Sequence, residues 1–185
     1  MIVRLTALIN QKCLSTHAAP EFYLYDPPLA ERVEGSTDVI KRQPTARREG
    51  DVLVNDFTVK NKTTSMVHLV TIDCCLYQSG DGTRCDCALA HEQQIRFVEF
   101  SHGVFRRRTT RVEKCIPQLA ATINDFYELG VIPAGSVVQA IICVGFTEDF
   151  PPRTATTDAR SAQLNLLVKA PVAVELRVSD ETTFE

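Results

Sequence analysis

Apolar residues recur at every second position over much of the chain after residue 50, and this alternation constrains the fold more than any other feature of the sequence. In the segment 65–78, Val70, Ile72, Cys74 and Leu76 share one face of an extended strand. Further strand-like segments follow at 94–100, 111–116, 136–146 and 162–178. Because successive side chains of a strand point to opposite faces, the pattern predicts an antiparallel sheet with a single buried face.

About seven short strands separated by turn signals are typical of an immunoglobulin-like β-sandwich, so we predict an all-β fold of this class with antiparallel strands. The chain has no tryptophan, and the tryptophan-centred core of a true immunoglobulin domain is therefore not expected. One segment departs from the alternation. Leu119, Ile123 and Phe126 keep helical spacing, and Gly130 can cap a helix. We expect either a helix over 118–130 or a strand that turns into a single helical turn.

The first 50 residues lack this regularity. Pro, Arg and Gly interrupt the polar segment before residue 50, and we predict an irregular N-terminal arm over residues 1–50, followed by the sandwich domain over residues 51–185. Within the arm, Phe22 and Leu24 alternate with Tyr23 and Tyr25. Such a segment is either a docking peptide that adds a strand to a partner or the first strand of the sandwich itself.

Three features between residues 50 and 178 carry a family resemblance. They are the polar turn at 61–64 between two strand-like segments, the Cys-Cys-Leu-Tyr run at 74–77, and the stretch from Leu166 through Pro171 to Val174. This arrangement resembles the first C-terminal β-barrel of transglutaminases. The resemblance implies the immunoglobulin-like fold alone, because the transglutaminase catalytic core is not represented and no catalytic residue can be transferred.

The charge balance limits the classes of partner. The formal net charge is −3, whereas a protein dedicated to nucleic-acid phosphates normally has a strong basic excess. Nucleic acid is therefore not expected as a partner. The apolar run at residues 2–9 is too short for a signal peptide or a membrane span. We expect a cytoplasmic protein with no membrane partner, whose seven cysteines stay mostly reduced.

Cysteines and a histidine surround a Gly-rich turn in the segment 73–91. Cys85, Cys87 and His91, with Cys74 or Cys75, are candidate zinc ligands, because thiolates and imidazoles are the ligands that zinc prefers. The spacing argues against this site. Only one residue separates Cys85 from Cys87, and the adjacent residues Cys74 and Cys75 would point to opposite faces of a strand. We therefore expect no metal or other cofactor. A disulfide from Cys75 to Cys85 or Cys87 is geometrically conceivable but disfavoured in a reducing compartment.

A basic run is the sharpest surface feature. It places five cations within ten residues, namely Arg106, Arg107, Arg108, Arg111 and Lys114. The guanidinium fork suits carboxylates and phosphates, so the run predicts contact with an acidic partner surface. The alternative is a solvated loop that offsets nearby acidic residues.

Common catalytic motifs such as G-x-S-x-G, H-E-x-x-H and the P-loop do not occur in the sequence. We therefore predict no enzyme. The expected function is a structural interaction protein that docks into a larger intracellular assembly, such as a cytoskeletal, axonemal or viral structure, through its arm and its basic loop. Its partners would be other protein subunits with acidic surfaces. The alternative is a zinc-stabilised or redox-active protein that uses the segment 74–91.

Overall fold

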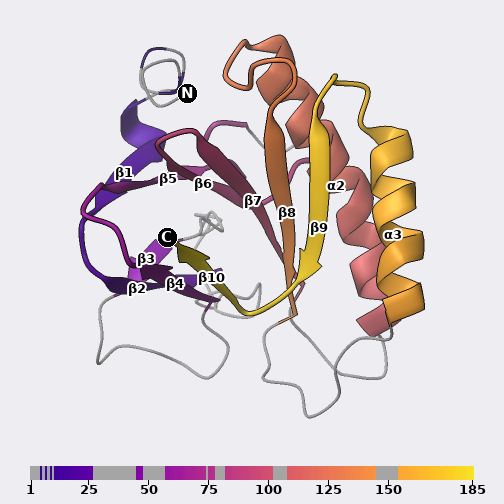
Figure 1. The fold of residues 1–185 in the computed structure, drawn as a ribbon, viewed down its shortest axis with the longest axis horizontal. Helices are drawn as coiled ribbons and strands as arrows, with labels where there is room; N and C mark the ends of the chain where they lie inside the picture. The colour runs from indigo at the N-terminus through magenta and orange to yellow at the C-terminus, as the bar shows by residue number, and fades with distance from the viewer. Residues whose placement is uncertain are drawn as a thin grey trace, which may run out of the picture.

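The computed structural model describes residues 5, 7, 9, 11–26, 45–47, 57–73, 75–77, 82–101, 108–144 and 154–185. Within them, two β-sheets and two α-helices form three layers, with the helices on one face of the larger sheet and the smaller sheet on its other face (Figure 1). The helices are α2 (Arg108–Glu128) and α3 (Thr154–Leu167), and a short 3-10 helix, η1 (Gln11–Cys13), precedes the first strand.

The larger sheet, called the first sheet below, has six strands in the order β1-β5-β6-β7-β8-β9. Its pairs are antiparallel from β1 to β7, whereas β7–β8 and β8–β9 are parallel. Parallel neighbours need a crossover connection, which α2 and α3 supply. The strands are β1 (Leu14–His17), β5 (Val67–Thr71), β6 (Cys87–His91), β7 (Gln94–Phe100), β8 (Val137–Cys143) and β9 (Ala173–Val178).

The smaller, second sheet has four strands in the order β10-β4-β2-β3. They are β2 (Glu21–Tyr25), β3 (Thr45–Arg47), β4 (Phe57–Asn61) and β10 (Glu181–Phe184). β10 runs parallel to β4, although the two strands lie at opposite ends of the sequence. The predicted β-rich character is confirmed. The parallel pairs and the two helices differ, however, from an immunoglobulin-like sandwich of antiparallel strands.

The first sheet is buried on both faces, which corrects the expectation of a single buried face. Val70 and Ile72 pack with the helices, while Val67 and Leu69 pack with the second sheet. β6 is buried at all five of its positions. Val70 and Ile72 therefore share a buried face as predicted, but Val67 and Leu69 on the other face are buried as well. A middle layer needs apolar side chains on both faces.

Helix α2 covers the segment 111–116, which the alternation had predicted to be a strand. The apolar residues that face the sheet recur at helical spacing through the whole helix, and Pro117 lies on the exposed side. Packing of this stripe outweighs the helix-breaking tendency of one proline. The helical spacing over 118–130 is confirmed. Gly130 has a φ of 73°, and the N–H groups of Gly130 and Val131 donate to the carbonyls of Tyr127 and Phe126, which is the Schellman arrangement of a helix end.

Helix α3 also replaces part of a predicted strand, at 162–167. Leu164 is 0% exposed and Leu166 is 84% exposed, so these two leucines do not share a buried face as the alternation required. The second half of the same segment is a strand as predicted, because Val174 and Leu176 of β9 are buried between exposed neighbours.

The described residues before position 50 belong to both sheets. β1 pairs with β5, and β2 pairs with β4, where Phe22 lies opposite Val59. Phe22 is 3% exposed between the sheets, and Tyr23 and Tyr25 are half-buried on the other face. The segment 21–25 is therefore a strand of the folded protein, the second of the two alternatives considered for it. A boundary at residue 50 would separate paired strands.

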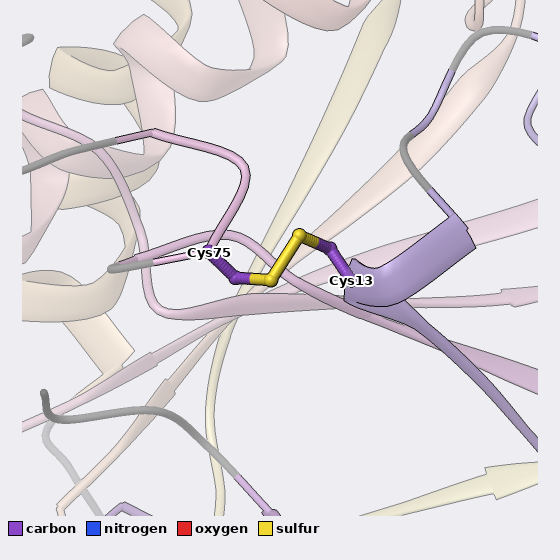
Figure 2. Close-up of a disulfide and its surroundings, with 2 residues drawn as sticks. All are labelled: Cys13 and Cys75. Atoms are coloured by element: carbon purple, nitrogen blue, oxygen red, sulfur yellow. A yellow bond between two sulfur atoms is a disulfide. The ribbon is translucent and has the colours of Figure 1, made fainter.

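A disulfide joins Cys13 at the end of η1 to Cys75 in the turn that follows β5 (Figure 2). The two Cα atoms are 5.6 Å apart, and 62 positions separate the cysteines in the sequence. This pair departs from the expectation that the cysteines stay mostly reduced. Cys85 and Cys87, the partners considered for Cys75, are free thiols.

We expect the disulfide to be a measurable source of stability. Closing a loop of this length restricts the unfolded chain and stabilises the fold by up to about 4 kcal/mol in the chain-entropy model. Cys75→Ala should lower the free energy of urea unfolding under oxidising conditions and have a much smaller effect when dithiothreitol is present. Peptide mapping without reduction should recover a Cys13–Cys75 cross-linked peptide. A free thiol at both positions in oxidised protein would contradict the assignment.

Candidate functional site

The residue before β6 brings a carboxylate to the end of β7. Asp86 precedes Cys87, which pairs with Val98 across the β6–β7 hairpin, so Asp86 stands beside Glu99. The carbonyl of Asp86 accepts hydrogen bonds from two successive N–H groups, those of Ile72 and Asp73, at 3.0 and 3.1 Å, which is the pattern of a β-bulge in the segment after β5. Here Asp86 Oδ2 accepts a 2.6 Å hydrogen bond from the N–H of Phe100, the last residue of β7.

The side chain of Glu99 meets that of Asp86, and we call the two the carboxylate pair. The groups are hydrogen-bonded to each other, and Glu99 is 5% exposed. Gln118 of α2 is also hydrogen-bonded to Glu99. Asp26, which follows β2 and is 4% exposed, adds negative charge from the side of the second sheet.

Burial makes both members of the pair weak acids. Burial raises the pKa of Asp86 to about 7, and the charge of Asp26 contributes to the rise. Burial, followed by the charge of Asp86, raises the pKa of Glu99 well above its usual range. Carboxyl groups with pKa values perturbed by burial and by one another are typical of functional sites.

Two side chains at this site, Glu99 and Arg111, each keep polar atoms without a hydrogen-bond partner among the described residues. Glu99 Oε2 is buried and accepts no hydrogen bond from the described residues. Arg111 of α2 donates from Nη1 to the carbonyl of Ser101 at 2.6 Å, while its Nε and Nη2 are buried without a partner in the described part of the chain. Glu99, Asp86 and Arg111 all act electrostatically on the thiol of Cys115.

The thiols around the carboxylate pair stay protonated at neutral pH. Burial, with the charge of Glu99 next in size, raises the pKa of Cys115 to about 12. Burial also raises the pKa values of Cys85 and Cys87 well above the ordinary value. A nucleophile or a metal ligand must be a thiolate, so these cysteines are packing residues in this environment.

The described residues that were proposed as zinc ligands do not come together at one point. Cys85 belongs to the apolar cluster on the helical side, and Cys87 belongs to the cluster between the sheets. His91 Nε2 shares a 2.8 Å hydrogen bond with the hydroxyl of Thr63. Cys74, the other proposed ligand, lies outside the described residues.

The predicted basic run is only partly placed. Arg106 and Arg107 lie outside the described residues, as does the side chain of Arg108, the first residue of α2. Of the remaining two cations, Lys114 is exposed and Arg111 is partly exposed beside the carboxylate pair. The structure therefore brings one of the predicted partner-binding cations to the site, whereas Phe22 lies in the core between the sheets.

Sequence reasoning missed the carboxylate pair, although one signal was present. Glu99 stands between Val98 and Phe100 in a strand of otherwise apolar character, and all of β7 after Gln94 is buried. A carboxylate inside such a strand is costly unless it has a structural partner or a function. Alternation places Glu99 on the same face as Ile95 and Phe97, both of which are buried.

Comparison of the chain with protein-family models, with curated proteins and with solved structures found no match. The resemblance to the transglutaminase barrel therefore stays a prediction. In the described part of the chain, no helix is both long enough and apolar enough to cross a membrane.

The raised carboxyl pKa values predict an unusual dependence of stability on pH. Between about pH 4 and pH 7 the folded protein keeps a proton on Asp86 that the unfolded chain has released, so the free energy of unfolding should fall as pH rises through this window. Asp86→Asn removes this titration and should be more stable than the wild type at pH 8, by on the order of 1–2 kcal/mol. Urea unfolding at pH 5 and pH 8 with EDTA measures both effects.

The matched control for this substitution is Asp158→Asn, which changes an exposed carboxylate of α3. Its stability should follow that of the wild type at both pH values. A wild-type stability that rises between pH 5 and pH 7, or an Asp86→Asn variant that gains nothing at pH 8, would contradict the assignment.

Proposed function

We propose that this chain binds a divalent cation at Asp86 and Glu99 and uses it to hydrolyse a phosphodiester. One observation carries the proposal: the buried Oε2 of Glu99 and the Nε and Nη2 of Arg111 lack partners among the described residues, and Arg111 is hydrogen-bonded to Ser101, two residues after Glu99. An acidic oxygen and a guanidinium fork left open at one site suit a cation and a phosphate respectively. The proposal departs from our expectation, on sequence grounds, of a protein without catalysis.

A magnesium ion suits this pair better than a zinc ion does. Mg²⁺ takes oxygen ligands and is usually held by one or two carboxylates, several waters and the phosphate oxygens of a substrate. The described residues contain no group of three or more Cys, His, Asp and Glu side chains that could hold a metal, so two carboxylates must suffice. The cation would displace a proton from the pair and offset the burial and negative charge that raise the two pKa values.

The chemistry assigned to each residue follows from its position. Asp86 and Glu99 would hold the cation, which would supply Lewis-acid chemistry toward a water and a phosphate oxygen. The water oxygen bonds to phosphorus, the P–O bond to the leaving alcohol breaks, and the proton lost by the water is balanced by the one the leaving group gains. Arg111 holds a non-bridging oxygen and stabilises the added negative charge. The site lies where β7 ends beside parallel β8, the edge at which sheets of this kind usually bind ligands.

Cation binding is the first test. Titration calorimetry at pH 7 in buffers of different ionisation enthalpy should show that Mg²⁺ or Mn²⁺ binds with release of protons, because Asp86 has a pKa of about 7. Asp86→Asn and Glu99→Gln should each weaken binding by at least about 10-fold. Glu113→Gln, an exposed carboxylate of the same helix as Arg111, should leave it unchanged. Equal affinity in all variants would overturn the proposal.

Hydrolysis is the second test. Purified protein with Mg²⁺ or Mn²⁺ should cleave bis(p-nitrophenyl) phosphate or labelled single- or double-stranded oligonucleotides, and EDTA should abolish the activity. Asp86→Asn and Glu99→Gln should lower the rate by on the order of 100-fold or more. Arg111→Lys keeps the charge and loses the fork, so it should lower the rate by about 10-fold or more, whereas Lys114→Ala should have little effect. Cation binding without turnover of any of these substrates would restrict the site to a structural role.

A non-catalytic interaction role, with other protein subunits as partners, is the second proposal. Apolar side chains near the carboxyl ends of α2 and α3 favour it, since Leu129 is 46%, Leu166 is 84% and Leu167 is 41% exposed. Asn124 holds these helix ends together by bonds to the carbonyl of Leu167 and to the N–H of Lys169. If a subunit of a larger assembly covers these leucines, the double variant Leu129→Ser/Leu166→Ser should no longer co-sediment with that assembly. Its cation binding should remain intact. Unchanged co-sedimentation would contradict this role.

A further inference from the structure

A second polar cavity lies on the opposite face of the first sheet from Glu99. Its volume is about 550 Å³, and strands β7, β8, β9 and β10 all contribute to its lining. Residues at even positions of β7, such as Val98, face the second sheet, whereas Phe97 faces the helices. Arg96 of the cavity and Glu99 of the carboxylate pair therefore project from the two sides of one strand.

Arg96 is the central group of this cavity. It is 6% exposed, and its guanidinium lies 3.8 Å from the centre of the Phe184 ring. It donates to the hydroxyl of Thr182 and, at 2.9 Å, to Oε1 of Gln94. Its Nε has no hydrogen-bond partner in the described part of the chain. Burial, followed by the charge of Arg177, lowers its pKa to about 10, so it remains a cation at neutral pH.

The glutamates around the cavity do not neutralise this cation. Glu181 pairs with Lys60 at 2.6 Å, Glu185 pairs with Lys62 at 3.2 Å, and Glu175 lies 3.6 Å from Arg177. Among the described residues, Arg96 itself has no carboxylate within ion-pair distance. A buried cation without a counter-ion is costly, and its cost is relieved when an anion binds.

An unpaired acceptor lies beside the unpaired donor. Gln139 stands directly opposite Arg96 in the β7–β8 register. Its amide nitrogen donates to Glu175 at 3.2 Å, and its buried Oε1 accepts nothing from the described residues. Arg96 and Gln139 both line the cavity. Each has one buried polar atom without a partner in the described part of the chain, a guanidinium N–H that suits an oxygen anion and a carbonyl oxygen that suits a donor.

We propose that this cavity binds a small organic carboxylate that carries a hydroxyl or amino group next to the carboxyl carbon. The carboxylate accepts from Arg96 Nε, and the neighbouring O–H or N–H donates to Gln139 Oε1. Glu175, Glu181 and Glu185 around the cavity disfavour a doubly charged phosphate. A planar carboxylate also fits the guanidinium fork. The site is separate from the carboxylate pair and does not depend on the hydrolytic function proposed above.

Ligand-observed NMR with purified full-length protein tests the proposal. The probes are alanine, glutamate, lactate and malate, each compared with its methyl ester or amide, and inorganic phosphate as a plain anion. At least one free acid should bind, and its ester or amide should bind at least about 10-fold more weakly, because the charge-assisted bond to Arg96 is lost. Failure of all four acids to bind would overturn the proposal, as would phosphate binding as tightly as the best acid.

Substitutions locate the bound acid. Gln139→Leu removes the acceptor and should weaken binding of the best acid by about 10-fold. Arg96→Lys should weaken it by a similar factor, and near-ultraviolet circular dichroism checks that the fold is kept. Asp86→Asn should bind the acid as the wild type does, which separates this site from the carboxylate pair. Affinity unaffected by both cavity substitutions would overturn the assignment.

Discussion

Burial of the first sheet on both faces is the constraint on which the rest of the structure depends. Helices cover one face and the second sheet covers most of the other, so a charged residue on the central strands has little water near it. β7 nevertheless carries two such residues, Arg96 and Glu99, at 6% and 5% exposure. Each retains a polar atom without a partner among the described residues. Both proposals of ligand binding start from the free-energy cost of burying these charged groups with unpaired polar atoms.

The sequence predicted the strands of the first sheet better than its surroundings. The segments at 67–71, 94–100, 137–143 and 173–178 are strands, and Gly130 ends a helix as expected. The start of α2 was missed because the segment 111–116 was predicted to be a strand, and α3 was missed because Leu164 and Leu166 stand two positions apart. In both cases tertiary packing decided between two local patterns that the sequence allowed.

The candidate site was largely out of reach of sequence reasoning. Arg111 was singled out by its basic neighbours, whereas Asp86 and Glu99 are thirteen positions apart and meet because the β6–β7 hairpin sets the residue before β6 beside the end of β7. A strand pattern assigns polar residues to the exposed face, and only the second sheet shows that no such face exists for β7. The disulfide was missed for a similar reason, since 62 positions separate its cysteines and neither lies in a recognisable pairing motif.

The cross-link between Cys13 and Cys75 has a consequence for the connectivity of the whole protein. The segment that it closes contains β2, β3 and β4, three of the four strands of the second sheet. A protease that nicks the backbone anywhere within this segment leaves two fragments that remain covalently attached. The second sheet can then reassemble from joined pieces after a single cleavage, and electrophoresis without reduction would hide the cut until the bridge is reduced.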